Sequence, residues 1–508
     1  MEKNVLEWLE CSAEKYPEAV AFADENDRIT FAGLRDKAQA VGTWLLNYVD
    51  RNEPVAFYLE KSVKAITGMF GAVYAGGFYS LMDVRQPEAR LQKIAETLEP
   101  AVIFADDENI DKAREMFPDR KVFMIEEIIA SAEKNMERLA AVREAAQDID
   151  PLYVNFTSGS TGTPKGVTIC HRSVIDFIPE LVKISGMKQD DIIGNQAPFD
   201  FDVSVKDIYS GIYLGAQVHI IPRSYFSNPT KLMDYLCERR CTVLIWAVSA
   251  MCFVSIMNGF SYKLPADVRL IMFSGEVMPN KQLNVWKKYL PHAQYVNLYG
   301  PTEITCNCTY YKLEDREYAL DEVIPIGIPF ANEKVFLLDE NDKLIDESQE
   351  GVTGEICVSG TCVGLGYYKD RQKTNETFVQ NPLNTKYNEI IYRTGDLGKY
   401  NDKQELLYVS RKDFQIKHLG HRIELGEIEA QVQAVDDVTR ACCIYDSVKK
   451  RILLFYTGSK DKKELQETLK TVLPPFMCPN KMFQLETMPM TKNGKIDRNE
   501  LKKTGGIQ

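Results

Sequence analysis

The pattern of hydrophobic and polar positions predicts a layered α/β fold over most of the chain. From Ile29 onward, short apolar runs of strand length alternate with amphipathic stretches of helix length. The apolar runs are VAFYL (55–59), AVIFA (101–105), QVHIIP (217–222) and VRLIMF (268–273). Because successive parallel strands need a crossover connection, this alternation indicates parallel sheets covered by helices.

The texture of the sequence changes twice further along the chain. After Gly351 the strand-like segments EICVSG, IIYRTG and ELLYVS follow one another closely, separated by Gly, Asn and Asp turns. They predict a β-rich subdomain at about 330–412. Beyond Asp413, helix-like GEIEAQVQAV and DKKELQETLKTVL alternate with strand-like ACCIYD and RILLFYTG. We therefore expect a large N-terminal domain, 1–412, and a small, mobile α+β domain, 413–508.

Two uncharged runs, 65–82 and 241–262, are long enough to span a bilayer. In the first, the pair Gly76-Gly77 separates helix-like AITGMFGAVYA from strand-like FYSLM. In the second, strand-like TVLIW is followed by a break and then by AMCFVSIM at helical spacing. Both runs therefore predict one buried helix and one buried strand rather than a membrane span.

The composition of the chain limits the classes of partner that it can be expected to bind. The 508 residues are 45% hydrophobic and 26% charged, which is typical of a globular protein. The net charge of -12 repels nucleic acid and anionic lipid, so we expect neither as a partner. The 12 cysteines include no CxxC pair, and the charged N-terminus lacks the apolar core of a signal peptide. These features favour a cytoplasmic location and give no zinc-ligand spacing.

The segment YVNFTSGSTGTPKGV (153–167) carries the strongest chemical signal. An apolar strand opens into a loop of small and hydroxylated residues that ends in a lysine. Glycine lets backbone N–H groups approach phosphate oxygens, hydroxyls add donors, and lysine adds a cation. Because Pro164 precedes the lysine and Gly166 follows it, this is not a Walker A loop. The candidate ATP-binding residues here are Thr157, Ser158, Gly159, Ser160, Thr161, Gly162 and Lys165.

The order of motifs resembles the adenylate-forming family over nearly the whole chain. That family includes adenylation domains of nonribosomal peptide synthetases, D-alanine carrier-protein ligases, acyl-CoA ligases and luciferases. The matching segments are ITFAGL (29–34), AGGFYSLMD (75–83), FTSGSTGTPKG (156–166), FDVS (201–204), NLYGPTE (297–303), GEICVSGTCVGLGYY (354–368), YRTGDL (392–397), SRKDFQIKHLGHRIELGEIE (410–429), LPPFMCP (473–479) and NGKIDR (493–498).

This resemblance implies ATP and Mg²⁺ as cofactors and assigns roles to the nucleotide-binding residues. The glycine-rich loop would cover the β and γ phosphates, Glu303 would help to hold Mg²⁺, and Thr302 would contact the α-phosphate. Tyr299 would stack on adenine, whereas Asp396 would bind the ribose hydroxyls beside Arg411. Taken singly, Asp396 also fits an Asx turn and Glu303 a first-turn helix acid.

The resemblance also implies a two-step reaction. Lys495 matches the lysine that bridges the substrate carboxylate and the α-phosphate, where cations offset the repulsion of two anions. Asp413 matches the hinge about which the C-terminal domain rotates before a thiol attacks the acyl adenylate. Ser410 departs from the glycine usual at this position, and its Cβ could restrict the backbone near the hinge.

The substrate is expected to be an amino acid, because Asp202 matches the carboxylate that pairs with the α-ammonium group. Asp202 also fits a helix N-terminal acid. Lys206 stands out in the first helical turn, where it would contact an acidic or carbonyl-bearing side chain or reach solvent. The motifs FSGEVMP and DFQIK instead resemble those of D-alanine carrier-protein ligases, whose pocket would suit a small residue. The predicted pocket residues are Val203, Lys206, Ile245, Ile271, Phe273, Leu298, Cys306 and Asn307.

The chain is therefore expected to be an amino acid adenylating ligase that transfers its product to a phosphopantetheine thiol. The sequence contains no carrier or condensation motif, so the acceptor is expected to be a carrier protein supplied in trans. An acyl- or aryl-CoA ligase shares every nucleotide motif, and Asp202 argues against it. A non-catalytic nucleotide-binding protein is the other alternative, and it predicts decay at Lys495, Glu303 or Asp396, which is not seen.

Overall fold

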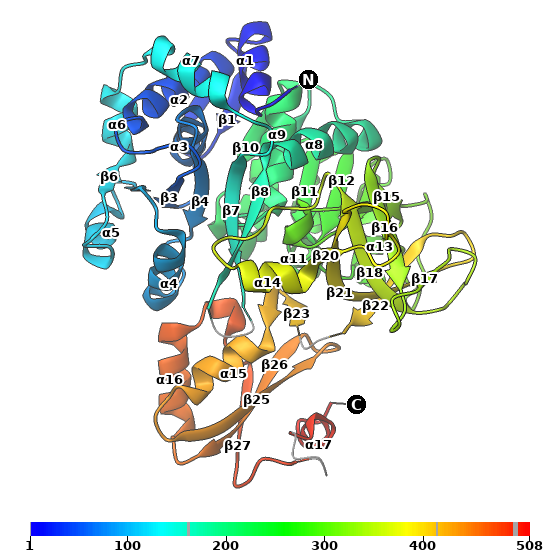
Figure 1. Ribbon diagram of the computed structural model, residues 1–508. Helices are drawn as coiled ribbons and strands as arrows, with labels where there is room; N and C mark the ends of the chain where they lie inside the picture. The colour runs from blue at the N-terminus through cyan, green and yellow to red at the C-terminus, as the bar shows by residue number, and fades with distance from the viewer. Residues whose placement is uncertain (1, 160–162, 413–414, 491–495, 508) are drawn as a thin grey trace. The chain divides into compact units, whose positions relative to one another are not determined.

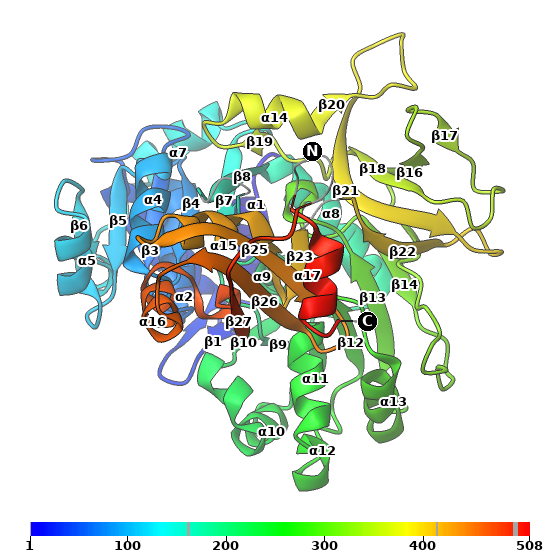
Figure 2. The same ribbon diagram turned by 90° about the horizontal axis from the view of Figure 1, so that it is seen from below.

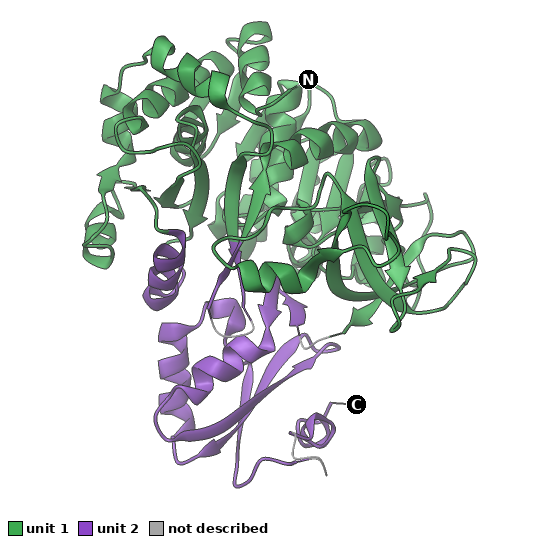
Figure 3. Cartoon of the chain, in the orientation of Figure 1, with its two compact units in different colours: residues 1–84, 99–155, 167–412 green, residues 85–98, 156–166, 413–508 purple. Residues whose placement is uncertain are grey.

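The computed structural model describes residues 2–159, 163–412, 415–490 and 496–507 (Figure 1). The chain folds into two compact units, which Figure 3 shows in two colours. The large unit comprises residues 1–84, 99–155 and 167–412, and the small unit comprises residues 85–98, 156–166 and 413–508. The small unit thus includes two N-terminal segments, 85–98 and 156–166, that the sequence pattern assigns to the large domain.

A seven-stranded sheet forms one layer of the large unit, in the order β19-β8-β7-β4-β3-β5-β6. Strands β4, β3, β5 and β6 pair in parallel, and edge strand β19 runs antiparallel to β8. The strands are β3 (Pro54–Tyr58), β4 (Phe78–Met82), β5 (Val102–Ala105), β6 (Val122–Met124), β7 (Pro151–Thr157), β8 (Lys165–Cys170) and β19 (Gly366–Tyr367). The helices of the large unit in this part of the chain are α2 (Phe31–Leu45), α3 (Val63–Tyr74), α5 (Ile110–Met116), α6 (Ile125–Ser131) and α7 (Met136–Ala145), whereas α4 (Glu88–Leu98) belongs to the small unit.

A nine-stranded sheet, in the order β15-β14-β13-β12-β11-β9-β10-β1-β2, forms the other α/β layer. Its centre, from β13 to β1, is parallel. The strands are β1 (Val20–Ala23), β2 (Arg28–Thr30), β9 (Ile192–Asn195), β10 (Gln217–Ile220), β11 (Val243–Ala247), β12 (Leu270–Ser274), β13 (Gln294–Tyr299), β14 (Thr309–Lys312) and β15 (Ile328–Pro329). The accompanying helices are α1 (Leu6–Lys15), α8 (His171–Ser185), α9 (Val203–Leu214), η1 (Arg223–Ser227), α10 (Pro229–Glu238), α11 (Val248–Ile256), α12 (Gly259–Tyr262), α13 (Asn280–Tyr289) and η2 (Thr302–Ile304).

Both long apolar runs fold as the sequence predicts. The first becomes buried helix α3 followed by buried strand β4, and the second becomes β11 followed by α11. The turn between α3 and β4 contains Gly76, whose φ of 77° lies in the region that favours glycine. Among the described residues, no helix combines the length and apolar character needed to cross a membrane.

The predicted β-rich region is a six-stranded antiparallel sheet. Figure 2 shows its strands β16, β18 and β21 side by side. Its members are β16 (Glu333–Leu338), β17 (Leu344–Ile345), β18 (Gly354–Gly360), β20 (Phe378–Gln380), β21 (Ile390–Tyr400) and β22 (Leu406–Arg411), with α14 (Arg371–Thr377) beside them. Ser410 pairs with Leu397 beside a register shift in the pairing of β21 with β22, and it has no positive φ, so glycine is not required there.

The small unit has α+β architecture with cores of its own. Leu425, Ile428, Leu454 and Leu465 pack together in the larger of these cores. Its elements beyond α4 are β23 (Gln415–His418), β24 (His421–Glu424), α15 (Leu425–Gln433), β25 (Val438–Asp446), β26 (Arg451–Gly458), α16 (Lys462–Val472), η3 (Pro475–Met477), β27 (Lys481–Leu485) and α17 (Arg498–Thr504).

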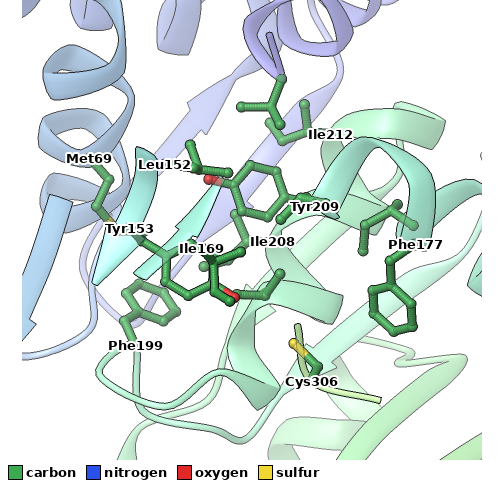
Figure 4. Packing of buried hydrophobic residues seen from close by; sticks show 14 of the residues in the cluster. Met69, Leu152, Tyr153, Ile169, Phe177, Phe199, Ile208, Tyr209, Ile212 and Cys306 are labelled. Atoms are coloured by element: carbon green, nitrogen blue, oxygen red, sulfur yellow. The ribbon is translucent and has the colours of Figure 1, made fainter. Parts of the chain in front are cut away.

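The main core of the large unit lies where helices α8 and α9 meet strands β7 and β8. Leu152 and Tyr153 of β7, Phe177 of α8, and Ile208 and Tyr209 of α9 are all buried in this cluster (Figure 4). Burying side chains of this size stabilises the fold by roughly 1.5–3 kcal/mol each. The cluster therefore holds α9, whose first turn carries candidate site residues, in a fixed position.

Candidate active site

The candidate site of the large unit is built at the carboxyl ends of neighbouring strands. Strands β11, β12 and β13 run parallel, and the residues that follow them therefore meet at one edge of the sheet. Ser274 ends β12, Tyr299 ends β13, and the short helix η2 follows with Thr302 and Glu303. This is the edge at which parallel α/β sheets bind their ligands.

The predicted ribose-binding carboxylate is held by two partners. Tyr299 donates its hydroxyl to Asp396 Oδ2 at 2.6 Å, and Arg411 donates to Oδ1 at 2.7 Å. Asp396 is only 1% exposed. Strand β21 supplies Asp396 and the paired strand β22 supplies Arg411, so an antiparallel register brings them together. The structure thus unites three residues that the sequence assigned to the nucleoside, and the Tyr299 bond to Asp396 is one that sequence reasoning missed.

The predicted magnesium ligand, Glu303, is fully buried. Its Oε1 accepts a hydrogen bond from the hydroxyl of Tyr367 at 2.7 Å, and its carbonyl accepts from the N–H of Gly364 at 2.9 Å. Both contacts come from the segment around β19, which is distant in the sequence. The Tyr367 bond orients the carboxylate and the Gly364 bond holds the backbone of Glu303. The sequence alone does not show that either residue contacts Glu303.

Asp202 immediately precedes α9 and is half-buried. Its side chain makes no N-capping hydrogen bond, so it does not serve the helix as a cap. Burial raises the pKa of Asp202, while a hydrogen bond from Thr302 and the charge of Lys206 act in the opposite direction. A cationic group arriving beside this carboxylate would stabilise its charged form.

Lys206 lies one helical turn beyond Asp202 and is 0% exposed. It does not reach solvent, which excludes one of the two interpretations that the sequence left open. Its Nζ donates to Asn307 Oδ1 at 2.6 Å and to Ser274 Oγ at 3.2 Å. Burial lowers the pKa of Lys206. The three residues come from α9, from the end of β12 and from the segment after η2.

Two predicted pocket residues lie on the opposite face of β12 from Lys206. Ile271 and Phe273 of β12 pack with Trp246 and Trp286 in a separate core cluster. Alternate residues of a strand face opposite sides of the sheet, so Met272 and Ser274 lie on the side of Lys206 instead. A pattern with a period of two, counted back from Ser274, would have selected them. The predicted positions 271 and 273 differ by one residue from 272 and 274, and a shift of one residue along a strand selects the opposite face.

The remaining predicted pocket residues belong to the Lys206 side of the sheet or to its edge. Ile245 and Leu298 are buried in the main core cluster, and Val203 is half-buried in the first turn of α9. Cys306 lies in the same cluster (Figure 4) and donates its Sγ–H to the carbonyl of Asp202 at 2.9 Å. Cys306 has a φ of 73°, unusual for a residue with a side chain, and this turn directs Asn307 toward Lys206.

The described part of the predicted phosphate loop belongs to the small unit. There the N–H of Gly159 donates to Glu427 Oε2 at 3.2 Å, and Lys165 Nζ lies 3.7 Å from Glu424 Oε1. Ser158 Oγ donates to the carbonyl of Arg422 at 2.8 Å and accepts from the N–H of Glu424. In this structure carboxylates contact the backbone N–H of Gly159 and the ammonium of Lys165. An N–H donor and an ammonium are groups that bind anions such as phosphate.

Glycine is required at position 159. A Cβ there would come within 2.0 Å of the carbonyl oxygen of Thr163, so any larger residue would displace the backbone. Thr157 ends β7, and its buried hydroxyl has no hydrogen-bond partner among the described residues. Five predicted residues lie outside the described residues, namely Ser160, Thr161, Gly162, Asp413 and Lys495.

Family comparison defines the class of protein. The model of the AMP-binding enzyme family matches residues 9–368, and that of the AMP-binding enzyme C-terminal domain matches residues 427–495. The chain belongs to the AMP-binding enzyme family, and its site residues lie in the segments that these models cover or between them.

The individual relatives include a large synthase, a carrier-protein ligase and, for the fold alone, an adenylation domain. The chain is 31% identical to tyrocidine synthase 3 of Brevibacillus parabrevis, over 99% of this chain but 8% of that protein. It is 28% identical to the L-proline--[L-prolyl-carrier protein] ligase of Streptomyces coelicolor, over 94% and 92% of the two chains. The fold is that of the Vibrio cholerae adenylation domain AlmE solved with glycyl-adenosine-5'-phosphate, with a TM-score of 0.83, 19% identity, and coverage of 100% and 98%.

Proposed function

We propose that the protein activates an amino acid with ATP as an aminoacyl adenylate and then transfers the aminoacyl group to a carrier protein. The observation that carries this proposal is the convergence of Asp202, Glu303 and Asp396 in the large unit. Asp202 and Glu303 flank one sheet edge, and Tyr299 ties Asp396 to the end of β13. The site thus offers one carboxylate for an ammonium, one for a metal and one for a ribose.

In the first step, a substrate carboxylate oxygen attacks the α-phosphorus of ATP, and the bond to the bridging oxygen of pyrophosphate breaks. Two anions react, so positive charge must surround the phosphates. Thr302 donates its hydroxyl to Asp202 in the structure, and this single donor would turn to an α-phosphate oxygen when ATP binds. Asp396, held by Tyr299 and Arg411, keeps lone pairs for the two ribose hydroxyls. Lys495 would supply the cation between the two reacting groups.

Glu303 fits the role of the Mg²⁺ ligand. Mg²⁺ prefers oxygen donors and keeps waters and substrate phosphates among its ligands, so a single protein carboxylate suffices. The Tyr367 bond orients one oxygen of the buried carboxylate. When bound, Mg²⁺ would neutralise the phosphate charge, and Glu303 would fix its position.

In the second step, a phosphopantetheine thiol attacks the acyl carbon, a thioester forms and AMP leaves. The proposed acceptor is a separate carrier protein, and the carrier-protein ligase among the relatives supports this choice. The chain spans 8% of the length of tyrocidine synthase 3. The reactions of such larger proteins are therefore assigned to this chain only as part of the proposal.

An acyl- or aryl-CoA ligase is the second candidate, because the nucleotide residues serve both reactions equally. Asp202 favours the amino acid, since burial raises its pKa and an ammonium partner would offset that cost.

The test is amino-acid-dependent release of pyrophosphate with Mg-ATP, across the proteinogenic amino acids and D-alanine. We expect release with one or a few of them, reduced at least ~100-fold by Lys495→Ala, which removes a cation beside the reacting groups, and by Asp396→Asn, which removes the carboxylate proposed to bind the ribose. Release only with aryl or fatty acids, in the presence of CoA, would overturn the amino acid assignment.

A further inference from the structure

Lys206 is a buried cation whose charge the described residues do not neutralise by an ion pair. Its two hydrogen-bond partners, Ser274 and Asn307, are both neutral. An ammonium has three donors, so one N–H remains beyond these two bonds. Among the residues that the structure describes, none forms an ion pair with Lys206. The charges of Asp202 and Asp207 favour the charged form of Lys206, but neither carboxylate forms an ion pair with it. A buried ammonium without an ion pair is costly, and it indicates a missing anionic partner.

The neighbouring carboxylate does not fill this role. Asp207 follows Lys206 on α9 and therefore projects in another direction. Its Oδ2 accepts from Asn195 Nδ2 at 2.7 Å, and burial raises the pKa of Asp207 to about 7. The helix dipole also destabilises the positive charge of Lys206, because the positive end of α9 lies within the same turn.

The position of Lys206 relates it to the substrate. Asp202 and Lys206 are four residues apart, so they occupy the same face of the chain at the start of α9, about 6 Å apart along the helix. If the α-ammonium of an amino acid pairs with Asp202, its side chain extends toward Lys206. Asn307 and Ser274 hold the Lys206 ammonium from two further segments and so orient it.

We infer that the amino acid substrate carries a side-chain carboxylate, which binds the Nζ of Lys206. The inference rests on the proposed function and names the substrate class of that same site. Asp202 and Lys206 then form a pair of opposite charges that matches the two ends of a dicarboxylic amino acid. An amide side chain accepts the same hydrogen bond but leaves the charge of Lys206 uncompensated.

The test measures amino-acid-dependent exchange of pyrophosphate into ATP with aspartate, glutamate, asparagine, glutamine, leucine and methionine. The wild-type protein is expected to use aspartate or glutamate with a kcat/KM at least ~10-fold above the matching amide. Lys206→Met keeps the length of the side chain but removes the charge. This variant is expected to lower kcat/KM for the acidic substrate by ~100-fold, chiefly through a higher KM. The kcat/KM values for leucine and methionine should rise relative to that of the acidic substrate.

A merely structural role for Lys206 would lower kcat/KM equally for every substrate, and that result would overturn the inference. Lys183→Met on the exposed part of α8 is the matched control and should leave the substrate preference unchanged. The wild-type panel decides the question even if Lys206→Met does not fold, because preference for a neutral amino acid refutes the inference alone. Exchange with no amino acid at all would instead refute the proposed function itself.

Discussion

His171 is a buried imidazole at the first position of α8. It is 3% exposed, and its Nδ1 accepts the N–H of Val5 at 3.3 Å. Burial lowers the pKa of His171 from 6.5 to about 3, although the nearby carboxylates of Asp150 and Asp148 act to raise it. Between these two pKa values the unfolded chain binds a proton that the folded protein does not bind. Stability is therefore lost as the pH falls through this window.

We expect His171→Asn to remove this pH dependence. The stability difference between the wild type and the variant should be about 2 kcal/mol smaller at pH 5 than at pH 7. Urea unfolding followed by tryptophan fluorescence measures it, because Trp8, Trp44, Trp246 and Trp286 all lie in the large unit. The exposed His292 provides the control. A difference that does not change with pH would show that His171 binds its proton as readily in the folded protein as in the unfolded chain.

At the scale of elements, an ion pair joins α4 to α15 within the small unit. Arg90 is 8% exposed and Glu427 is 3% exposed, and each is the other's charge partner. Glu427 also accepts the N–H of Gly159. Burial raises the pKa of Glu427, and the guanidinium of Arg90 opposes that rise. The pair thus connects three separate segments of the chain.

Removing one partner of this pair should be costly. Glu427→Ala leaves the guanidinium of Arg90 buried without a counter-charge, and we expect a loss of about 3–5 kcal/mol. Glu467→Ala breaks the exposed pair with Lys470 in α16 and should change stability by less than about 1 kcal/mol. Calorimetric unfolding of the two variants measures the contrast. Equal effects would mean that Arg90 finds another partner or solvent.

At the scale of the whole molecule, separate cores predict more than one unfolding transition. The large unit has its main cluster around α8 and α9, whereas Leu454 of β26 belongs to a cluster within the small unit. Proteins built from several compact units commonly depart from two-state unfolding. Each unit can therefore respond to changes in its own core.

Leu454→Ala should destabilise the small unit alone. Leu454 is 0% exposed, so the truncation leaves a cavity that costs about 2–5 kcal/mol. We expect one calorimetric transition to move to lower temperature, while the unfolding followed by tryptophan fluorescence stays unchanged. The surface substitution Lys470→Ala serves as the control. A matching shift in the fluorescence transition would show that the two units unfold together.

The sequence by itself determined the kinds of elements, their order, and most of the residue types of the site. These follow from local signals, since periods of two and of about 3.6 residues mark strands and helices wherever they occur. Runs 65–82 and 241–262 show this, because each divided into the helix and the strand that its glycines and spacing predict. The glycine-rich loop likewise showed its chemistry through residue types alone.

Only the tertiary structure decided which side chains meet. The bond from Tyr299 to Asp396 joins positions 97 residues apart, and nothing local to either residue specifies it. The face of β12 was decided by its neighbours in the sheet, so Met272 and Ser274 replaced Ile271 and Phe273 on the side of Lys206. The burial of Lys206 depended in the same way on β12 and on the turn at Cys306. Pairing and burial arise between segments, and a sequence pattern records only what lies within one.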